Sequence, residues 1–291
     1  MRALNNGCIL AVMFVVCGIA TPVRAQTDVQ PPPGDASPAP SSNMPAFGTS
    51  LVAPAFDIDP IVQQPAGPPP TPRHTGIKAL AKGTVVNFKY LPSLENLMWA
   101  GIGGGLALAV HPADDDVNRA LVGSDFADKF FKAGEVLGEL PTLLGSASVV
   151  YAVGRLKDRP RVSHVGMDLI QSLAMSEALT QTLKYTTRRE RPDGSGKNSF
   201  PSGHAADTFA FATSLERHLG WKYAVPAYTF ASYVAISRLP ANRHWLSDAV
   251  FGSAVGIIAG RTVTSHEAHP FPVTVTFVFG GAAVMYVHRG N

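Results

Sequence analysis

Residues 201–219 read PSGHAADTFAFATSLERHL, a short PSGH motif followed by a largely apolar run of helix length. Ser202 is a residue type that favours the N-cap position, and the run from Ala205 to Leu219 has helical spacing. The backbone N–H groups of Gly203 and His204 are expected to be free in the first turn, where a helix attracts anions. The stretch therefore predicts a helix whose start binds a negatively charged group, with His204 placed to donate a proton to it.

Further apolar stretches of helix length lie on both sides of this segment, separated by Gly, Pro and charged clusters. Leu140 to Gly154 and Tyr223 to Ser237 are each 15 residues long without a charge, which suits buried helices better than membrane spans of about 20 residues. We expect an all-α bundle of six to seven helices with the site at one end. The expected helices cover 94–110, 124–139, 141–157, 163–187, 202–219, 222–238 and 244–262.

The C-terminal tail has a different period. Val273, Val275 and Phe277 alternate with other residues ahead of Gly280-Gly281. Alternation around a pair of glycines is typical of two strands joined by a tight turn, so we expect a short β-hairpin within 272–288.

Two short motifs and one apolar run invite other interpretations. Gly103-Gly104-Gly105 follows no strand and precedes no Lys-Ser/Thr, so close helix packing is expected there rather than a phosphate loop. Asp114-Asp115-Asp116 is expected to be an exposed turn and helix start rather than a metal site. Asn96 to Ala113 is the best candidate for a membrane span, although its glycines and His111-Pro112 weaken it.

The composition is that of a charge-poor globular protein. The chain has 291 residues, 24 Lys+Arg against 21 Asp+Glu, a formal net charge of +3, and 46% hydrophobic and 15% charged residues. A disordered chain carries fewer apolar residues, and a nucleic-acid binder carries a larger positive excess. A folded protein without a nucleic-acid partner is predicted.

Residues 1–25 have the organisation of a cleaved secretory signal. Arg2 supplies the positive start, Cys8 to Ala20 is uncharged, and Val23-Arg24-Ala25 offers the small residues that a signal peptidase accepts. The uncharged run would reach only about 20 Å of a hydrocarbon core of about 30 Å, so cleavage after Ala25 is favoured over an uncleaved anchor. Both cysteines lie in this segment, which leaves the mature chain without thiol chemistry.

Residues 26–76 are predicted to be a disordered Pro-rich linker. Between Gln26 and Thr75, 13 of 50 residues are Pro, which is incompatible with helices and strand ladders. The segment is either a solvated tail or a spacer that holds the domain away from a surface. The folded domain is expected over 77–291, with its motifs between 184 and 248.

Two further clusters carry chemistry. His244 and Asp248 are four residues apart at the start of an expected helix, so a carboxylate could hold one imidazole nitrogen and leave the other free as a base or nucleophile. Lys184 and Arg191 bracket a basic stretch, and Arg238 ends the preceding expected helix. These cations form either a solvated positive face or a clamp for phosphate oxygens.

Taken together, the clusters match the pattern K-x6-RP, then PSGH, then SR-x5-H-x3-D, with every specified residue present between Lys184 and Asp248. The sequence resembles the type 2 phosphatidic acid phosphatase superfamily, which also contains bacterial acid phosphatases and vanadium haloperoxidases. The expected helices from 94 to 262 fit the helical bundle of this family.

The resemblance implies a role for each matched residue. His244 is implied to be the nucleophile that takes the phosphoryl group, Asp248 its orienting partner, and His204 the group that protonates the leaving oxygen and then activates water. The residues implied to hold phosphate oxygens are Lys184, Arg191, Ser202, Gly203 and Arg238. No metal and no other cofactor is implied. The nearby cations and the helix N-terminus are expected to outweigh Asp248 and to keep His244 neutral in the empty site.

The sequence thus predicts a metal-independent phosphatase acting on phosphomonoesters or lipid phosphates through a phosphohistidine on His244. One alternative is a vanadate-dependent haloperoxidase, although members of that group are usually longer. Another is a non-catalytic phosphate or phospholipid binder, which would need the cations but neither base nor acid. The expected location is exported, either periplasmic or membrane-associated, with peripheral membrane contact.

Overall fold

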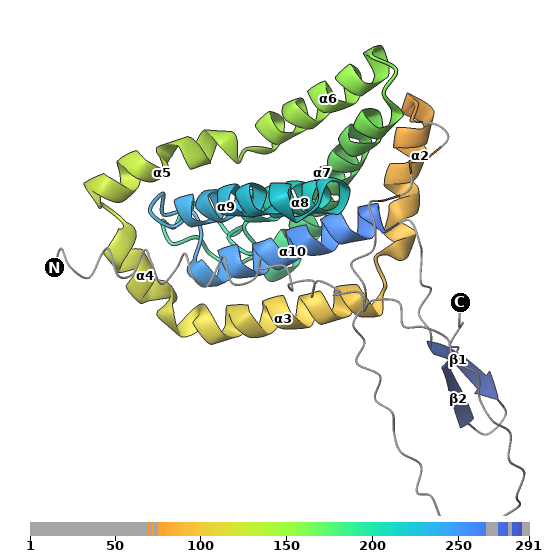
Figure 1. The fold of residues 1–291 in the computed structure, drawn as a ribbon. Coiled ribbons are helices and arrows are strands. Elements are labelled where there is room, and N and C mark those ends of the chain that lie inside the picture. Colours follow the sequence, from red (N-terminus) through yellow and green to blue (C-terminus); the bar gives the residue numbers. More distant parts are fainter. Residues whose placement is uncertain (1–68, 70, 73–74, 266–272, 279–280, 287–291) are drawn as a thin grey trace, which may run out of the picture. The chain divides into compact units, whose positions relative to one another are not determined.

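A computed structural model describes residues 69, 71–72, 75–265, 273–278 and 281–286. The expected signal segment and nearly all of the expected linker lie outside the described residues. Helices dominate the described part, which confirms the all-α prediction (Figure 1). The elements are α2 (Ile77–Asn87), η1 (Phe88–Tyr90), α3 (Leu94–Val110), η2 (His111–Ala113), α4 (Asp114–Leu121), α5 (Asp125–Leu137), α6 (Leu140–Leu156), α7 (Pro160–Thr187), α8 (Gly203–Leu219), α9 (Trp221–Ser237), α10 (Leu246–Thr264), β1 (Val273–Val278) and β2 (Gly281–Tyr286).

Each expected helix is present as a single α-helix, with ends shifted by three residues or fewer. Helix α2 was not expected from the sequence, and only the start of α4 was. Strands β1 and β2 pair antiparallel, with Val273 opposite Tyr286 and Val278 opposite Gly281. This is the hairpin that the strand period predicts.

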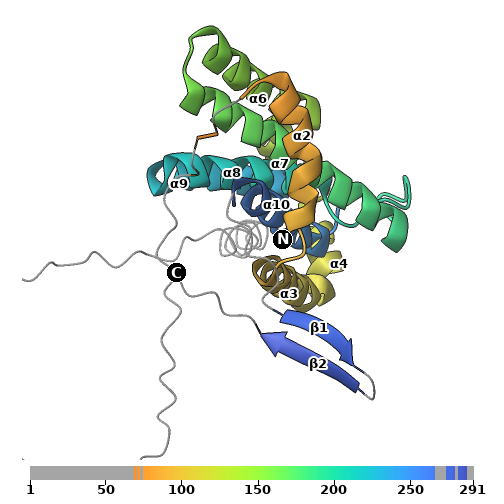
Figure 2. The ribbon, with the colours of Figure 1, turned by 90° about the vertical axis from the view of Figure 1, so that its right-hand side faces the viewer.

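Helices α7 to α10 lie between α3 on one side and α5 with α6 on the other (Figures 1 and 2). The backbones of α8 and α10 touch because α10 places glycines on the shared face. A Cβ added to Gly252 would lie 2.5 Å from the carbonyl oxygen of Ser202, and one added to Gly256 would collide with that of Ala206. This close packing fixes the start of α8 against the start of α10.

Among the described helices, α10 is long and apolar enough to cross a membrane, and 89% of its apolar stretch is buried inside the protein. Core helices of soluble proteins have the same properties, so α10 by itself says little about a membrane. Helices α5 and α6 meet the same criterion together, with a bend of 50° between them. The stretch singled out in the sequence, Asn96 to Ala113, forms most of α3, which has 17 residues, and all of η2.

The glycines of α3 serve packing in part, as expected. A Cβ on Gly103 would collide with Ala254 of α10, and one on Gly104 would meet Phe251 at 3.7 Å, whereas Gly105 has nothing within 4 Å. The outer face of α3 is instead exposed and apolar, with Leu97 at 62% and Leu108 at 74% of full exposure.

Candidate active site

The residues singled out in the sequence come from the ends of four helices. Lys184 lies in the last turn of α7, Ser202 to His204 at the start of α8, Arg238 at the end of α9, and His244 and Asp248 at the start of α10. Backbone hydrogen bonds join these ends, because Ser202 N donates to Asp248 O at 3.0 Å and His244 N to Arg238 O at 3.4 Å. The bundle therefore brings distant parts of the chain to one site.

The start of α8 forms as predicted, with Ser202 as the N-cap residue. Its side chain, however, makes no capping hydrogen bond. The Ser202 hydroxyl is buried and has no hydrogen-bond partner among the described residues. Lys184 approaches the same turn, since its Nζ lies 3.7 Å from the position of a Cβ built on Gly203.

Two guanidinium groups at this end carry further unused donors. The Nε atoms of Arg191 and Arg238 are buried without a partner among the residues that the structure describes. Their positive charges reach the other site residues. Burial is the main cause that lowers the pKa of Lys184, and the charge of Arg191 lowers it further. Burial likewise lowers the pKa of His204 most, and the charge of Arg238 adds to this. These cations and unpaired donors together form a positive, partly buried cluster that can bind an anion.

His204 contacts α5, because its Nε2 donates to the carbonyl oxygen of Glu135 at 3.2 Å. This hydrogen bond makes Nδ1 the nitrogen that can exchange a proton with a bound group. Burial, together with the charge of Arg238, lowers the pKa of His204 to about 4. The imidazole is therefore neutral near pH 7 in the ligand-free site.

His244 is 5% exposed and lies in the loop just before α10. Its Nδ1 donates to the carbonyl oxygen of Ser199 at 2.6 Å, which leaves Nε2 with a free lone pair in the neutral ring. Burial lowers the pKa of His244, and Lys184 and Arg238 lower it further against the opposing effect of Asp248. The direction agrees with the sequence prediction, although burial is the larger cause.

Asp248 differs from its predicted geometry. Its Oδ2 lies 3.8 Å from His244 Nδ1, farther than the Ser199 carbonyl that takes the hydrogen bond. The carboxylate instead accepts hydrogen bonds from the Ser199 hydroxyl and from the backbone N of Trp245 at 2.9 Å. Asp248 thus holds the residues on either side of the imidazole in place, and acts on the ring mainly through its charge.

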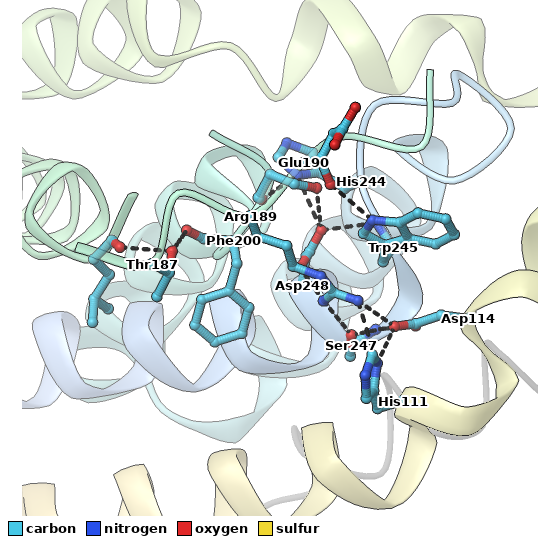
Figure 3. A network of polar contacts seen from close by, with 12 residues as sticks. His111, Asp114, Thr187, Arg189, Glu190, Phe200, His244, Trp245, Ser247 and Asp248 are labelled. Atoms are coloured by element: carbon cyan, nitrogen blue, oxygen red, sulfur yellow. Dashed lines mark hydrogen bonds and ion pairs between the residues drawn. The ribbon is translucent and has the colours of Figure 1, made fainter. Parts of the chain in front are cut away.

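Arg189 is the first of three residues near the site whose roles the sequence interpretation missed. Its Nη1 donates to Asp248 Oδ1 at 2.6 Å and to Ser247 Oγ at 2.7 Å, and its Nη2 to Asp114 Oδ2 at 2.7 Å (Figure 3). Burial alone would raise the pKa of Asp248, but hydrogen bonds to the carboxylate and the charge of Arg189 hold it below its usual range. Nothing in the sequence distinguished Arg189 from the exposed Arg188 beside it.

Asp114 corrects the expectation of an exposed acidic turn. It does begin α4, as expected, and Asp115 and Asp116 are exposed. The Asp114 side chain, however, is only 4% exposed and accepts hydrogen bonds from the backbone N of Ser247 at 2.9 Å and from Arg189. Helix α4 therefore supports the site from outside, because Asp114 fixes the arginine that holds Asp248 (Figure 3).

Asp207 lies one turn into α8, within the run from Ala205 to Leu219 that the sequence analysis described only as apolar and helical. Burial raises its pKa to about 7, while Lys184 acts in the opposite direction. A carboxyl group that changes charge near neutral pH thus lies close to the Lys184 ammonium.

The part of the chain that carries these residues is similar to a known protein family. Residues 165–268 match the model of the PAP2 superfamily. A lipid A 1-phosphatase from Porphyromonas gingivalis is 45% identical over 92 residues, which are 31% of this chain and 21% of that protein. A PA-phosphatase related-family protein from Dictyostelium discoideum is 27% identical over 147 residues, covering 40% of this chain and 54% of the relative.

The fold has a counterpart of known structure. A transmembrane PAP2 type phosphatidylglycerolphosphate phosphatase from Bacillus subtilis superposes with a TM-score of 0.50 at 22% identity, covering 58% of this chain and 92% of that protein. The match to the curated relatives spans about a fifth of one and about half of the other. The matched segment, residues 165–268, contains α8 to α10 and every predicted site residue, and over this segment the match to the PAP2 superfamily model confirms the resemblance read from the motifs.

Proposed function

We propose that the chain is a metal-independent phosphatase that hydrolyses phosphomonoesters, lipid phosphates above all, through a phosphohistidine on His244. The observation that carries the proposal is the set of buried donors without described partners, Arg191 Nε, Ser202 Oγ and Arg238 Nε, beside two histidines. Leaving such a donor unpaired costs about 1–3 kcal/mol. A bound phosphate supplies acceptors for all three at once.

In the first step, His244 Nε2 attacks phosphorus while the bond from phosphorus to the leaving oxygen breaks. Arg191, Arg238 and Lys184 stabilise the charge on the non-bridging oxygens. The phosphate also offsets the positive charge that lowers the pKa of His204. His204 takes up a proton from solvent as the substrate binds, and it delivers that proton to the leaving oxygen as the bond to phosphorus breaks.

In the second step, water attacks the phosphohistidine. His204, now neutral, accepts a proton from that water, and the nitrogen–phosphorus bond breaks as inorganic phosphate forms. His244 recovers its lone pair, and Ser199 keeps the ring in the same tautomer throughout.

An apolar surface beside the site favours a lipid substrate. Glu135 of α5 contacts His204, and the next two residues, Val136 and Leu137, are 60% and 45% exposed. The faces of α3 and α6 add further exposed apolar side chains, including Leu94, Leu97, Met98, Ile102, Leu106, Leu108, Leu144, Val149, Val153 and Leu156. Exposed apolar side chains on both sides of the bundle are typical of a membrane contact, so the domain is membrane-associated, with acyl chains beside α5 at its active end.

Export completes the proposal. The signal-like segment 1–25 directs the chain out of the cytoplasm and is removed after Ala25, and the linker 26–76 connects the new N-terminus to the domain. N-terminal sequencing of protein purified from the native membrane fraction checks this, and a chain that still begins at Met1 contradicts it.

The decisive experiment measures release of inorganic phosphate from an aryl phosphate and from phosphatidic acid in detergent micelles, with EDTA present. Turnover is expected on both substrates, with the higher kcat/KM on the lipid, and His244→Ala is expected to abolish it. Arg188→Ala is the matched control, because the Arg188 side chain is exposed and, among the described residues, donates a hydrogen bond only to Tyr185 O. Alkaline quenching after labelled substrate should recover phosphohistidine in the control and none in His244→Ala.

Three results contradict the proposal in different ways. Turnover that survives His244→Ala removes the phosphohistidine. Turnover lost on chelation at a temperature where the protein stays folded removes the metal-free route. No turnover with vanadate still bound points to a haloperoxidase or to a binding protein.

A further inference from the structure

A second cluster of titratable side chains lies away from the catalytic end. His164 and Asp168 are one turn apart near the start of α7, and His218 is in the last turn of α8. His164 Nε2 lies 3.3 Å from Asp168 Oδ2, and His218 Nε2 lies 2.9 Å from the same oxygen. The three side chains are 1%, 0% and 5% exposed. Two helices therefore direct three ligand-type atoms to one buried point.

This cluster is separate from the site proposed for phosphate. His164 and Lys184 are 20 positions apart along α7, and His204 and His218 are 14 positions apart along α8. At a rise of about 1.5 Å per residue, these intervals are about 30 Å and about 21 Å. An ion bound at the cluster would therefore be too far from the proposed phosphate site to contact a bound phosphate.

We propose that His164, Asp168 and His218 bind one zinc ion that joins α7 to α8. The three ligand atoms lie within 4.8 Å of one another. Zinc–nitrogen and zinc–oxygen bonds of about 2.0–2.2 Å in a tetrahedron place neighbouring ligand atoms about 3.3–3.6 Å apart. Small rotations of the side chains bring the observed distances to these values. Two imidazoles and one carboxylate leave the fourth position for water.

The ring orientations also suit a metal. The imidazoles of His164 and His218 are nearly perpendicular, at 88°, with centroids 4.8 Å apart. Each presents Nε2 to the shared centre without stacking on the other ring. A chain of hydrogen bonds through Asp168 is the simpler alternative, and it differs from a zinc site in needing no metal.

The first test is the metal content of the untagged full chain, purified in detergent without chelator. About one zinc per chain is expected by mass spectrometry of the elements. His218→Asn and Asp168→Asn should each reduce this at least tenfold. His111→Asn is the matched control, because His111 also pairs with a carboxylate, at 2.8 Å from Asp114, but outside the cluster. It should keep its zinc.

A second measurement uses the unmodified protein, in case a variant fails to fold. X-ray absorption at the zinc edge should show two imidazole ligands and oxygen at about 2.0–2.1 Å. Returning zinc to chelator-treated protein should raise the midpoint of thermal unfolding by about 5 °C or more. Substoichiometric metal, no shift on adding zinc, or zinc retained in His218→Asn overturns the proposal and leaves a hydrogen-bonded cluster.

Discussion

The two ends of α7 and α8 use histidines and charged groups in opposite ways. At the end with Lys184 and His204, buried donors of Arg191, Ser202 and Arg238 lack partners among the described residues. At the other end, His164 and His218 both direct a ring nitrogen to Asp168. Donors without partners suit a substrate that binds and dissociates, whereas side chains that already contact one another suit a permanent structural role. The same pair of helices can thus hold a reactive end and a fixed end.

Removing one of the unused donors tests this contrast most strongly. Arg238→Ala is expected to lower kcat/KM by about 10²–10³-fold, because one aligned donor to developing charge contributes that much. Steady-state hydrolysis of phosphatidic acid measures the loss, with Arg188→Ala as the exposed control. A reduction below tenfold would mean that Arg238 does not contact the phosphate.

Substituting Arg189 distinguishes a residue that holds the site in place from a residue that binds the substrate directly. Arg189→Ala removes hydrogen bonds to Asp248 and Asp114 and is expected to lower kcat by about 10–100-fold with little change in KM. Because Arg189 acts through Asp248, Asp114→Asn should show the same pattern with a smaller effect. If KM rises while kcat is unchanged, Arg189 binds substrate instead.

The neutral His204 at the proposed catalytic end should make the free energy of unfolding depend on pH. The folded pKa of His204, about 4, lies below the unfolded value of about 6.5, so the unfolded chain binds more protons between these values. The stabilisation is complete above about pH 6.5 and is lost as the pH falls toward 4. Between pH 7 and pH 5 the loss should be about 2 kcal/mol.

Denaturant unfolding in detergent measures this difference for wild type and for His204→Asn. The variant should lose about 2 kcal/mol less than wild type over the same pH interval. Equal losses would show that His204 is not the source. Saturating phosphate should also reduce the loss in wild type, because the bound anion favours the protonated imidazole.

The smallest expected effect concerns Ser202. A serine that caps its helix stabilises the protein by about 0.5–2 kcal/mol, but the Ser202 hydroxyl makes no capping hydrogen bond. Ser202→Ala should therefore change the free energy of unfolding by less than about 0.5 kcal/mol and lower kcat/KM by about tenfold. A stability loss without a kinetic effect would identify Ser202 as a cap and not as a phosphate ligand.

The fold was largely predictable because its signals are local. Apolar runs bounded by Gly and Pro placed seven helices within three residues, and the strand period placed the hairpin. Helix α2 was missed because its sequence, IKALAKGTVVN, is short, contains a glycine followed by three β-branched residues, and follows the Pro-rich segment directly. The spacing of the motifs also identified the histidines and cations that lie at one end of the folded bundle.

What the sequence could not give depends on contacts between distant residues. Asp114 and Arg189 are 75 positions apart, and their pairing arises only when α4 packs near the start of α10. The contact of His244 with the Ser199 carbonyl is likewise invisible, because a backbone oxygen has no signature in the sequence. The cluster of His164, Asp168 and His218 needs α7 and α8 side by side before it exists.

The glycines of α10 make the spacing of the two histidines proposed to be catalytic depend on contacts of the main chain. Since Gly252 lies against Ser202, and Ser202 N donates to Asp248 O, the segments that carry His204 and His244 are held together through their main chains. Chemistry can therefore stay constant while the exposed faces of α3, α5 and α6 change. New substrate preferences can be engineered on those faces without retuning the reaction.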